Sequence, residues 1–408
     1  MKRVVITGMG AVSPFGTGTD SLMKSLSAGD SGIRSMDDFA QITGLKPTIA
    51  GKVPDYNAKS IPRKFRRTMS PMSIFATLAA QEAISQAGLN KDILSGGTTG
   101  LSVSSTVGSV QALQSFFTTF LNGFSIEEIK ATEFFKIMNH SCAANLAQCF
   151  EITGRVMAPS AACSTGCQTI GLAAEAIAIG KQDIMLCGGA DELHPLTVGT
   201  FDIIQAASTG YNKQPTSTPR PFDRDRDGIV CAEGAGILVL ESLDSAQERG
   251  ADILAEIIGF SSTADPSNLA SPSSAAIARC MQLALDDAGI PPEAVQYVNA
   301  HATGTKLGDA AENSAIASLF GSKPLVSSLK GHLGHTMAAS GALETIATVL
   351  MMNNGLVVPT RNLINIAPDC MGSRHIRQIE RQPVSMALKN SFALGGINTS
   401  IILRRDND

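Results

Sequence analysis

The stretch that decides the fold is residues 158–180, "APSAACSTGCQTIGLAAEAIAIG". Small residues surround Cys163, and an apolar run with helical spacing follows it directly. We therefore expect Cys163 at or just before the N-terminus of a helix, where the helix dipole and free backbone N–H groups lower the pKa of a thiol and make it a nucleophile. A small buried cysteine packed in a core is the competing interpretation of this stretch taken alone.

Outward from this stretch, short apolar runs rich in β-branched residues have the length of buried strands. They begin at Arg3, Thr99, Asp183, Gly234, Leu254, Val295, Pro324, Val384 and Thr399. Alanine-rich stretches with helical spacing separate several of them, at residues 72–86, 168–180, 275–288, 309–319 and 338–352. The alternation predicts an α/β fold whose sheets are covered by helices on both faces.

The two halves of the sequence resemble each other weakly. Each begins with a strand that ends in small residues, "VVITGMGAVS" and "AEIIGFSSTAD", and later carries an alanine-rich helix followed by "SQAGLN" or "LDDAGIPP". A repeat of about 250 residues indicates a duplicated unit and not a solenoid. We place the divide near Gly250, which gives an N-terminal half of residues 1–250 and a C-terminal half of residues 251–408.

One segment, residues 107–144, interrupts this alternation and concentrates phenylalanine in "QSFFTTF" and "EFFKIMNH". It is expected to be an insertion that caps a pocket or pairs subunits. Ordinary core packing is an equally good interpretation.

The composition excludes several classes of protein. Over 408 residues, 32 Lys and Arg against 36 Asp and Glu give a net charge of −4, without the basic field of a nucleic-acid-binding protein. Eight cysteines without a CxxC pair indicate neither a disulfide framework nor a zinc knuckle, which fits a reducing cytoplasm. We find no convincing signal peptide and no apolar run long enough to span a membrane, so a cytoplasmic protein without a membrane or nucleic-acid partner is expected.

Three motifs of the second half place polar residues or glycines where strands end: "YVNAHATGTKLGD", "PLVSSLKGHLGHTMAASGALE" and "LKNSFALGGINTS". The first contains His301, and the second contains Lys330, His332 and His335. Ligands of α/β proteins collect at the carboxyl ends of strands, so these motifs indicate a binding site. Zinc held by Cys163, His301 and His335 is the rival interpretation, but no compact ligand pair or neighbouring carboxylate favours it.

Five motifs in order, "SAACSTG", "RPFDRDRDGIVCAEGAG", "VNAHATGTKLGDAAE", "SSLKGHLGHTMAASGALE" and "NSFALGGINTS", make the chain resemble the β-ketoacyl-acyl-carrier-protein synthases over its whole length. Within that family it is similar to the elongating type with one cysteine and two histidines. The resemblance implies a thiolase-like α/β fold in which the two halves stack as five αβαβα layers. It also implies a homodimer, or a heterodimer with a related condensing-enzyme subunit, with residues 107–120 near the twofold axis.

The same resemblance implies the catalytic residues. Cys163 takes an acyl chain from the phosphopantetheine arm of an acyl carrier protein. His301 and His335 promote decarboxylation of a malonyl unit, because their N–H groups stabilise the enolate oxygen. Lys330 holds the charge balance of the site, and the backbone N–H groups of Cys163 and Leu394 form an oxyanion hole for the acyl carbonyl.

Further roles are implied for neighbouring residues. Asp309 and Glu344 are supporting groups, and Thr303 and Thr305 bind the pantetheine arm. Substrate contacts are also expected from Phe392, Leu394 and Val107. The family implies no redox cofactor and no catalytic metal, although its members can hold a structural monovalent cation near Asn299 and Glu344.

The chain departs from the family pattern in the loop that gates acyl access. Many elongating members have a Gly-Phe pair where this chain has Ala393 and Leu394. A different chain-length or substrate preference is therefore expected. His332 is an additional residue, for which we expect either a solvated turn position or an effect on Lys330.

A basic cluster is the candidate docking surface for the carrier protein. The stretch "PRKFRRTMS" supplies Arg63, Lys64, Arg66 and Arg67 within about one helical turn. Such a cluster steers an acidic partner, and Lys64 and Arg67 are the residues implied to dock it. A solvated charged face is the alternative.

Together these residues predict a decarboxylative Claisen condensation that extends an acyl thioester on Cys163, in fatty acid, polyketide or aryl-polyene-like synthesis. A non-catalytic subunit that sets chain length is the alternative, and the presence of Cys163, His301, Lys330 and His335 argues against it. A degradative thiolase would need a second cysteine near "SFALGGIN", and none is there.

Overall fold

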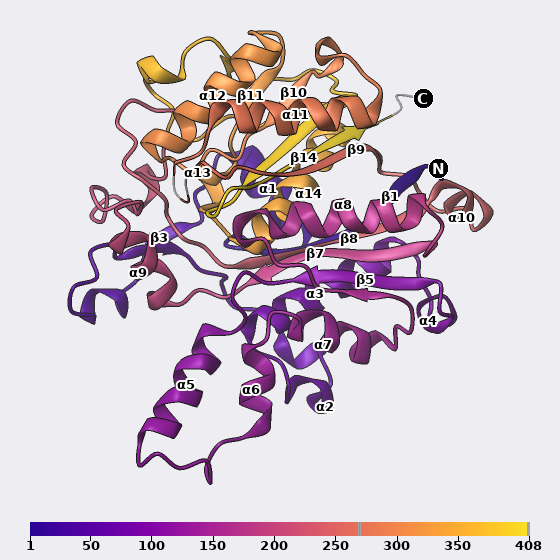
Figure 1. The fold of residues 1–408 in the computed structure, drawn as a ribbon, viewed down its shortest axis with the longest axis vertical. Helices are drawn as coiled ribbons and strands as arrows, with labels where there is room; N and C mark the ends of the chain where they lie inside the picture. Colours follow the sequence, from indigo (N-terminus) through magenta and orange to yellow (C-terminus); the bar gives the residue numbers. More distant parts are fainter. Residues whose placement is uncertain (268, 270, 406–408) are drawn as a thin grey trace.

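The computed structural model describes residues 1–267, 269 and 271–405, and its centre is a sheet of 12 strands (Figure 1). The strand order is β12-β11-β10-β13-β14-β9-β1-β8-β7-β5-β6, with β2 (Gly16–Thr17) paired to β1. One half of the sheet holds β1 (Val4–Ser13), β8 (Gly234–Ser242), β7 (Ile184–Asp191), β5 (Thr99–Ser104) and β6 (Val156–Met157). The other half holds β9 (Ala255–Ala264), β14 (Ile397–Arg404), β13 (Met386–Phe392), β10 (Tyr297–Asn299), β11 (Leu325–Ser327) and β12 (Arg374–His375).

The two halves of this sheet have the same topology. β1 pairs with β8 as β9 pairs with β14, in both cases antiparallel. β8 pairs with β7 as β14 pairs with β13, again antiparallel, and the next pairs outward, β7 with β5 and β13 with β10, are parallel. The halves join where the first residues of β1 run antiparallel to β9. The predicted internal repeat is therefore present in three dimensions.

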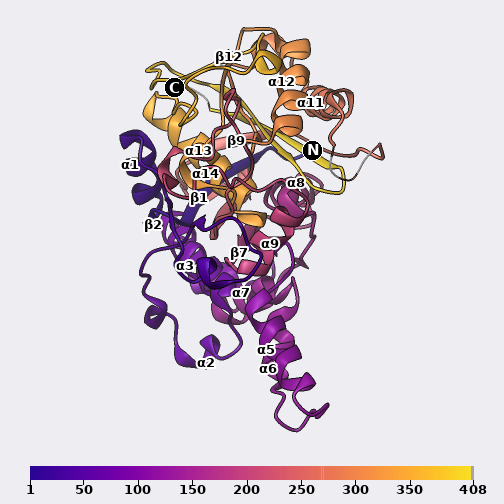
Figure 2. The same ribbon diagram turned by 90° about the vertical axis from the view of Figure 1, so that its left-hand side faces the viewer.

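Helices form three layers around the two halves (Figures 1 and 2). α3 (Pro71–Gln86) and α7 (Ser141–Phe150) cover the outer face of the first half, and α11 (Ser274–Ala288) and α12 (Lys306–Phe320) cover that of the second. α8 (Thr165–Ala178) and α14 (Ala338–Asn354) lie between the halves and contact strands of both. This αβαβα arrangement confirms the expected thiolase-like fold, with the difference that the two β-layers are hydrogen-bonded into one continuous sheet.

The central layer explains why its helices are rich in small residues. α14 is buried along almost its whole length, since protein covers it on every side. α8 and α14 cross at two glycines: a Cβ on Gly341 would lie 2.3 Å from the backbone nitrogen of Cys167, and one on Gly166 would lie 2.6 Å from the carbonyl oxygen of Ala338. This close approach fixes the N-terminal ends of both helices relative to each other.

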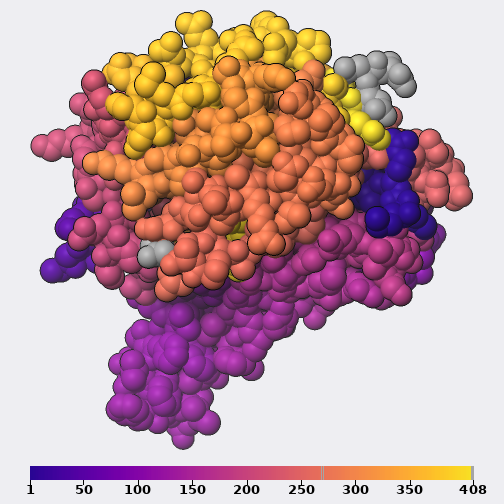
Figure 3. All heavy atoms as spheres, turned by 45° about the horizontal axis from the view of Figure 1, so that its top comes forward, coloured from indigo at the N-terminus to yellow at the C-terminus, as the bar shows by residue number. Residues whose placement is uncertain are grey.

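The phenylalanine-rich segment leaves the body of the protein. α5 (Val110–Leu121) and α6 (Ala131–Ile137) form a projecting hairpin, drawn in purple at the bottom of Figures 1 and 3, before the chain returns to the sheet through α7. The interpretation as core packing is wrong for this hairpin, because it exposes large apolar side chains at Phe117, Leu121, Phe124, Ile126 and Phe134.

All of the strands and helices that the sequence predicts are present. Shorter elements complete the chain: α1 (Thr19–Ala28), α2 (Arg63–Arg66), α4 (Lys91–Ser95), α9 (Pro195–Ile203), α10 (Leu243–Glu248), α13 (Lys330–Leu333), and a two-stranded sheet of β3 (Ile33–Ser35) and β4 (Ile49–Gly51). Gly250 lies in the link between α10 and β9. Within the described residues, no helix is both long enough and apolar enough to cross a membrane.

Candidate active site

Cys163 lies at the turn between β6 and α8. A single 3-10 turn, Ala162–Ser164, precedes the helix, and Ala162 has a φ of 46°, an unfavourable value for a residue other than glycine. The Ser164 hydroxyl donates to the carbonyl oxygens of Ser391 and Ile397, at 2.9 and 2.8 Å. The turn thus presents the cysteine at the helix N-terminus, as predicted, and connects it to the adjoining ends of β13 and β14.

A cavity of about 820 Å³ brings together residues that are far apart in the sequence. Its lining includes these predicted site residues: Cys163, His301, Thr303, Thr305, His335, Phe392 and Leu394. Val107 is not part of the lining, and its side chain is 51% exposed at the base of the projecting hairpin. A substrate contact by Val107 stays a prediction that needs a second subunit.

The two histidines both line this cavity and lie next to each other, edge to face. Their ring centroids are 5.5 Å apart, nearly perpendicular at 84°. Nδ1 of His335 lies 2.9 Å from the Ser340 hydroxyl, whereas His335 Nε2 and His301 Nδ1 are buried without a hydrogen-bond partner among the described residues. Buried polar atoms without a partner are costly, so these nitrogens are suited to a ligand that accepts hydrogen bonds.

A carboxylate that the sequence analysis did not single out holds the His301 loop. Glu312 accepts the backbone N–H groups of His301 and Ala302, at 2.8 and 2.7 Å, and also the side-chain amide of Asn390, at 3.1 Å. Glu312 is one helical turn beyond Asp309 on α12, inside the "GDAAEN" stretch. The sequence therefore shows the motif that contains Glu312, but it does not show which groups Glu312 contacts.

Asp309 and the two threonines connect this loop to another motif. Asp309 accepts the backbone N–H groups of Phe222 and Gly304, at 2.8 and 3.1 Å. Burial raises the pKa of Asp309 to about 7. The hydroxyls of Thr303 and Thr305 are 3.3 Å apart at the cavity wall. The carboxylate therefore fixes the backbone from which both threonines project.

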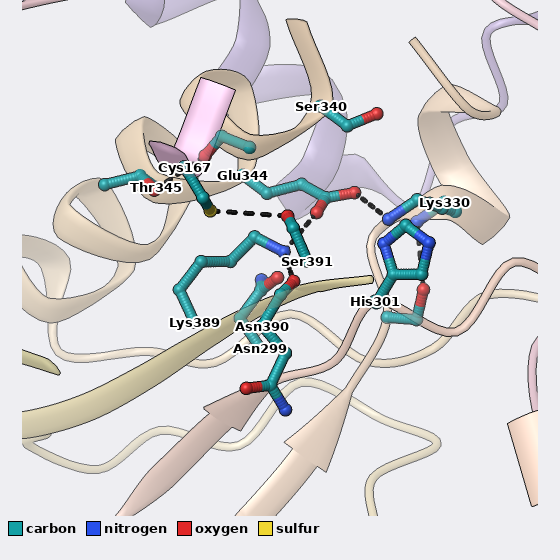
Figure 4. Close-up of polar contacts among 12 residues, drawn as sticks. Cys167, Asn299, His301, Lys330, Ser340, Glu344, Thr345, Lys389, Asn390 and Ser391 are labelled. Atoms are coloured by element: carbon teal, nitrogen blue, oxygen red, sulfur yellow. Dashed lines mark hydrogen bonds and ion pairs between the residues drawn. The ribbon is translucent and has the colours of Figure 1, made fainter. Parts of the chain in front are cut away.

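Lys330 lies behind the histidines and is fully buried. Its Nζ is 2.7 Å from Oε1 of Glu344, whose Oε2 is 2.6 Å from Nζ of a second fully buried lysine, Lys389 (Figure 4). Burial lowers the pKa of Lys330, and Glu344 opposes that effect. Sequence reasoning missed Lys389, whose only signal is a charged residue within the apolar strand "MALKNSF".

Burial and these charges set the protonation of the histidines. Loss of solvation lowers the pKa of both His301 and His335 well below the ordinary value, and Lys330 adds to the effect. Both imidazoles are therefore neutral near pH 7 and keep one N–H donor each.

The prediction that the helix N-terminus lowers the pKa of Cys163 is wrong in direction. Burial raises the pKa of this thiol to about 11, because removal of water from the thiolate outweighs the opposing effects of the Leu394 amide and Lys330. The resting cysteine is a thiol. The backbone amides of Leu394 and of Cys163 itself act to lower this pKa, so both N–H groups of the expected oxyanion hole lie near the sulfur.

His332 differs from both expectations. Its side chain is buried, with Nδ1 and Nε2 each 3.0 Å from a backbone carbonyl oxygen, those of Asp30 and Pro359. It is not a solvated turn residue, and its hydrogen bonds lead away from Lys330. Its position between two loops gives it a structural role.

The groups expected near a monovalent cation do not fit a separate ion. The ammonium group of Lys389 already contacts Glu344 Oε2 and donates to the backbone carbonyl of Asn390. Nζ of Lys389 therefore already contacts two of the oxygen atoms that would bind the ion. Elsewhere, too, the described residues contain no group of three or more His, Cys, Asp or Glu arranged to hold a metal ion.

The predicted docking residues are on the surface. Lys64 and Arg67 are exposed at α2, with Lys64 Nζ 4.6 Å from the centroid of the Phe65 ring. Arg66 is different, because its Nε donates to the carbonyl oxygen of Ile61 at 2.9 Å. Arg66 therefore stabilises the local fold, whereas the exposed side chains of Lys64 and Arg67 are accessible to another molecule.

Comparison with known proteins identifies the family models and structures that this chain matches. Two family models match, "Beta-ketoacyl synthase, N-terminal domain" over residues 1–246 and "Beta-ketoacyl synthase, C-terminal domain" over residues 254–364. The chain is 35% identical to 3-oxoacyl-[acyl-carrier-protein] synthase 1 of Haemophilus influenzae, with complete coverage of both chains. Among solved structures, a β-ketoacyl synthase from Burkholderia phymatum is similar with a TM-score of 0.96 and 41% identity, again over 100% of each chain. A type II polyketide ketosynthase solved with its acyl-carrier protein has a TM-score of 0.91 and 31% identity, with 100% of each chain covered.

Proposed function

This chain belongs to the β-ketoacyl synthase family, and from that premise we propose that Cys163, His301, His335 and Lys330 carry out its reaction. The enzyme is a 3-oxoacyl-[acyl-carrier-protein] synthase, an acyltransferase that condenses malonyl-carrier protein with an acyl chain in fatty acid or polyketide elongation. The observation that carries the assignment of residues is the single cavity on which the cysteine and both histidines converge. All of these residues are present, which disfavours a non-catalytic subunit that only sets chain length.

Acyl loading is the first half-reaction. The sulfur of Cys163 attacks the thioester carbonyl of an acyl-carrier protein and gives up its proton, and the pantetheine thiol leaves with a proton. The carbonyl oxygen becomes negative in the tetrahedral intermediate, and the amides of Cys163 and Leu394 stabilise it. The positive charge of Lys330 favours the thiolate during the attack.

Decarboxylation is the second half-reaction. The carbon–carbon bond to the malonyl carboxylate breaks, carbon dioxide leaves, and the electron pair forms an enolate whose oxygen needs hydrogen-bond donors. If the Ser340 hydroxyl donates to His335 Nδ1, the proton of that neutral ring lies on Nε2, the atom without a partner in the protein. His335 Nε2–H and an N–H of His301 then stabilise the enolate, and its carbon attacks the acyl-Cys163 thioester and expels the sulfur.

Apolar side chains give the acyl chain a place to lie. Beyond Cys163 the cavity is lined by residues such as Phe201, Ile204 and Ile229, with Leu394 at the gating loop. Thr303 and Thr305 also line the cavity, and we assign to them the binding of the pantetheine arm. The balanced reaction needs no redox cofactor or catalytic metal, because the substrates bring their own activated thioesters.

Two surfaces fit protein partners. Exposed Lys64 and Arg67 offer positive charge to an acidic carrier protein, which raises its rate of encounter. The apolar surface of the hairpin formed by α5 and α6, including Phe117 and Leu121, suits burial against a second subunit, identical or related. That subunit would also reach Val107.

The organisation of the chain and its compartment complete the proposal. We assign the cysteine half to residues 1–250 and the histidine half to residues 251–408. All eight cysteines are unpaired, which supports a reducing compartment such as the cytoplasm.

Intact-protein mass spectrometry tests the assignment. The protein is incubated with acyl-carrier proteins of several chain lengths, with and without malonyl-carrier protein. An acyl adduct that needs Cys163 and disappears on addition of malonyl-carrier protein is expected. Cys163→Ala should abolish the adduct, and Cys149→Ala, at a half-buried cysteine outside the cavity, should keep it. An adduct retained by Cys163→Ala would overturn the assignment.

A further inference from the structure

The ammonium group of Lys389 occupies an unusual place for a lysine. The residue is in β13, three residues before Phe392, which lines the cavity, and its side chain is completely buried. Figure 4 shows the side chain of Lys389 running beneath Glu344, where its Nζ contacts one carboxylate oxygen and Lys330 contacts the other. One carboxylate thus bridges two ammonium groups.

Charge balance shows what Lys389 contributes. Two buried carboxylates, Glu344 and Glu312, lie in this region with two buried lysines, Lys330 and Lys389. Lys389 acts on both carboxylates, by the ion pair with Glu344 and by lowering the pKa of Glu312 against the effect of burial. Without Lys389, a net negative charge would remain buried behind the histidines, and an uncompensated buried charge is strongly destabilising.

The surrounding acceptors are those of a monovalent cation site. Nζ of Lys389 contacts a carboxylate oxygen of Glu344 and the carbonyl oxygen of Asn390. The side-chain oxygen of Asn299 is buried nearby without a hydrogen-bond partner among the described residues (Figure 4). Carbonyl and carboxylate oxygens are the ligands by which proteins replace the water of potassium ions.

We infer that Lys389 is a covalently attached substitute for a monovalent cation, so that this enzyme holds Glu344, and through it Lys330, without a bound ion. Lys389 is then a positioning residue, since it acts on the reaction only through Glu344 and Lys330. The effect of Lys389 on stability depends on the buried charges alone, whereas its effect on the condensation rate rests on the proposed function.

The test compares cations at constant ionic strength. Melting temperature and condensation rate are measured in potassium, ammonium and choline chloride for the wild type, Lys389→Ser and Lys389→Met. Choline is too large for the space that a shortened side chain leaves. The methionine of Lys389→Met fills that space without a charge, which makes it the matched control.

Distinct results are expected for the three proteins. The wild type should melt at the same temperature in all three salts. Lys389→Ser should lose roughly 5 °C in choline and recover most of this loss in potassium or ammonium, together with its condensation rate. Lys389→Met should be destabilised equally in every salt.

Several outcomes would overturn the inference. The first is a wild type that loses stability when choline replaces potassium, a result that does not require any variant to fold. The others are a Lys389→Ser protein that gains no more from potassium than Lys389→Met, and one whose stability responds to pH but not to the cation. Failure of the wild type to form an acyl adduct would contradict the proposed function and leave the thermal result intact.

Discussion

Removal of the Ser340 hydroxyl should separate the two half-reactions. This hydroxyl lies 2.9 Å from His335 Nδ1 and 3.1 Å from the hydroxyl of Thr336, and the residue is buried. In Ser340→Ala, Nδ1 loses its partner, and the ring proton is no longer directed to Nε2. Decarboxylation depends on that proton, whereas acyl loading on Cys163 does not.

The size of the effect follows from the burial of the bond. A neutral hydrogen bond contributes about 0.5 to 1.5 kcal/mol, and leaving a buried acceptor without a partner costs about 1 to 3 kcal/mol. The donation from Nε2 to the enolate strengthens in the transition state, so most of this cost falls on the barrier. A loss of about 1 to 2 kcal/mol corresponds to decarboxylation slowed about 5- to 30-fold.

Two assays with one control decide the outcome. Carbon dioxide release from malonyl-carrier protein reports decarboxylation, and intact mass reports the rate of acyl loading. Thr345→Val is the control: Thr345 is buried in the same helix, but its hydroxyl donates to the carbonyl of Gly341, at 2.6 Å. Thr345→Val should change neither the rate of carbon dioxide release nor the rate of acyl loading. An unchanged rate of carbon dioxide release in Ser340→Ala, or an equal loss in both half-reactions, would refute this role of the hydroxyl.

Three further predictions concern the nucleophile and the partner surfaces. Because burial raises the pKa of Cys163 to about 11, its alkylation by iodoacetamide should accelerate about tenfold per pH unit between pH 7 and 10, and a plateau below pH 8 would contradict this. Lys64→Glu with Arg67→Glu should raise KM for the carrier protein about tenfold at low salt with kcat unchanged, whereas Lys181→Glu, in the exposed turn after α8, should have no effect in the same steady-state assay. Leu121→Glu should convert the proposed dimer to a monomer in light scattering, and an unchanged mass would exclude the hairpin as the interface.

The sequence predicted the central architecture because its signals are local. Buried strands are continuous apolar runs, and the helices of the central layer are rich in alanine because both faces contact protein. The same reasoning did not predict the position of the hairpin of α5 and α6. Phenylalanines at helical spacing look alike whether they face a core or another subunit, so the pattern left both interpretations open.

The partners and pKa values of buried ionisable side chains were the second feature that the sequence could not show. The partner of Lys389 is Glu344, 45 residues earlier in the chain, and only the packing of α14 against β13 brings them together. The pKa of Cys163 depends on the competition between the backbone amides and the loss of water. The sequence shows the helix N-terminus but not the depth of burial, and in this case burial prevails.

The duplicated fold explains why the nucleophile and a histidine meet. α8 follows β6 in the first half as α14 follows β11 in the second, and these two helices share the central layer. Cys163 lies two residues before the start of α8, and His335 lies three residues before that of α14. Each of these turns contains a residue with positive φ, Ala162 at 46° before Cys163 and Met337 at 51° after His335. Because Gly166 and Gly341 let the helices cross closely, the equivalent turns of the two halves face one cavity, where one supplies the sulfur for the acyl group and the other the N–H group for the enolate.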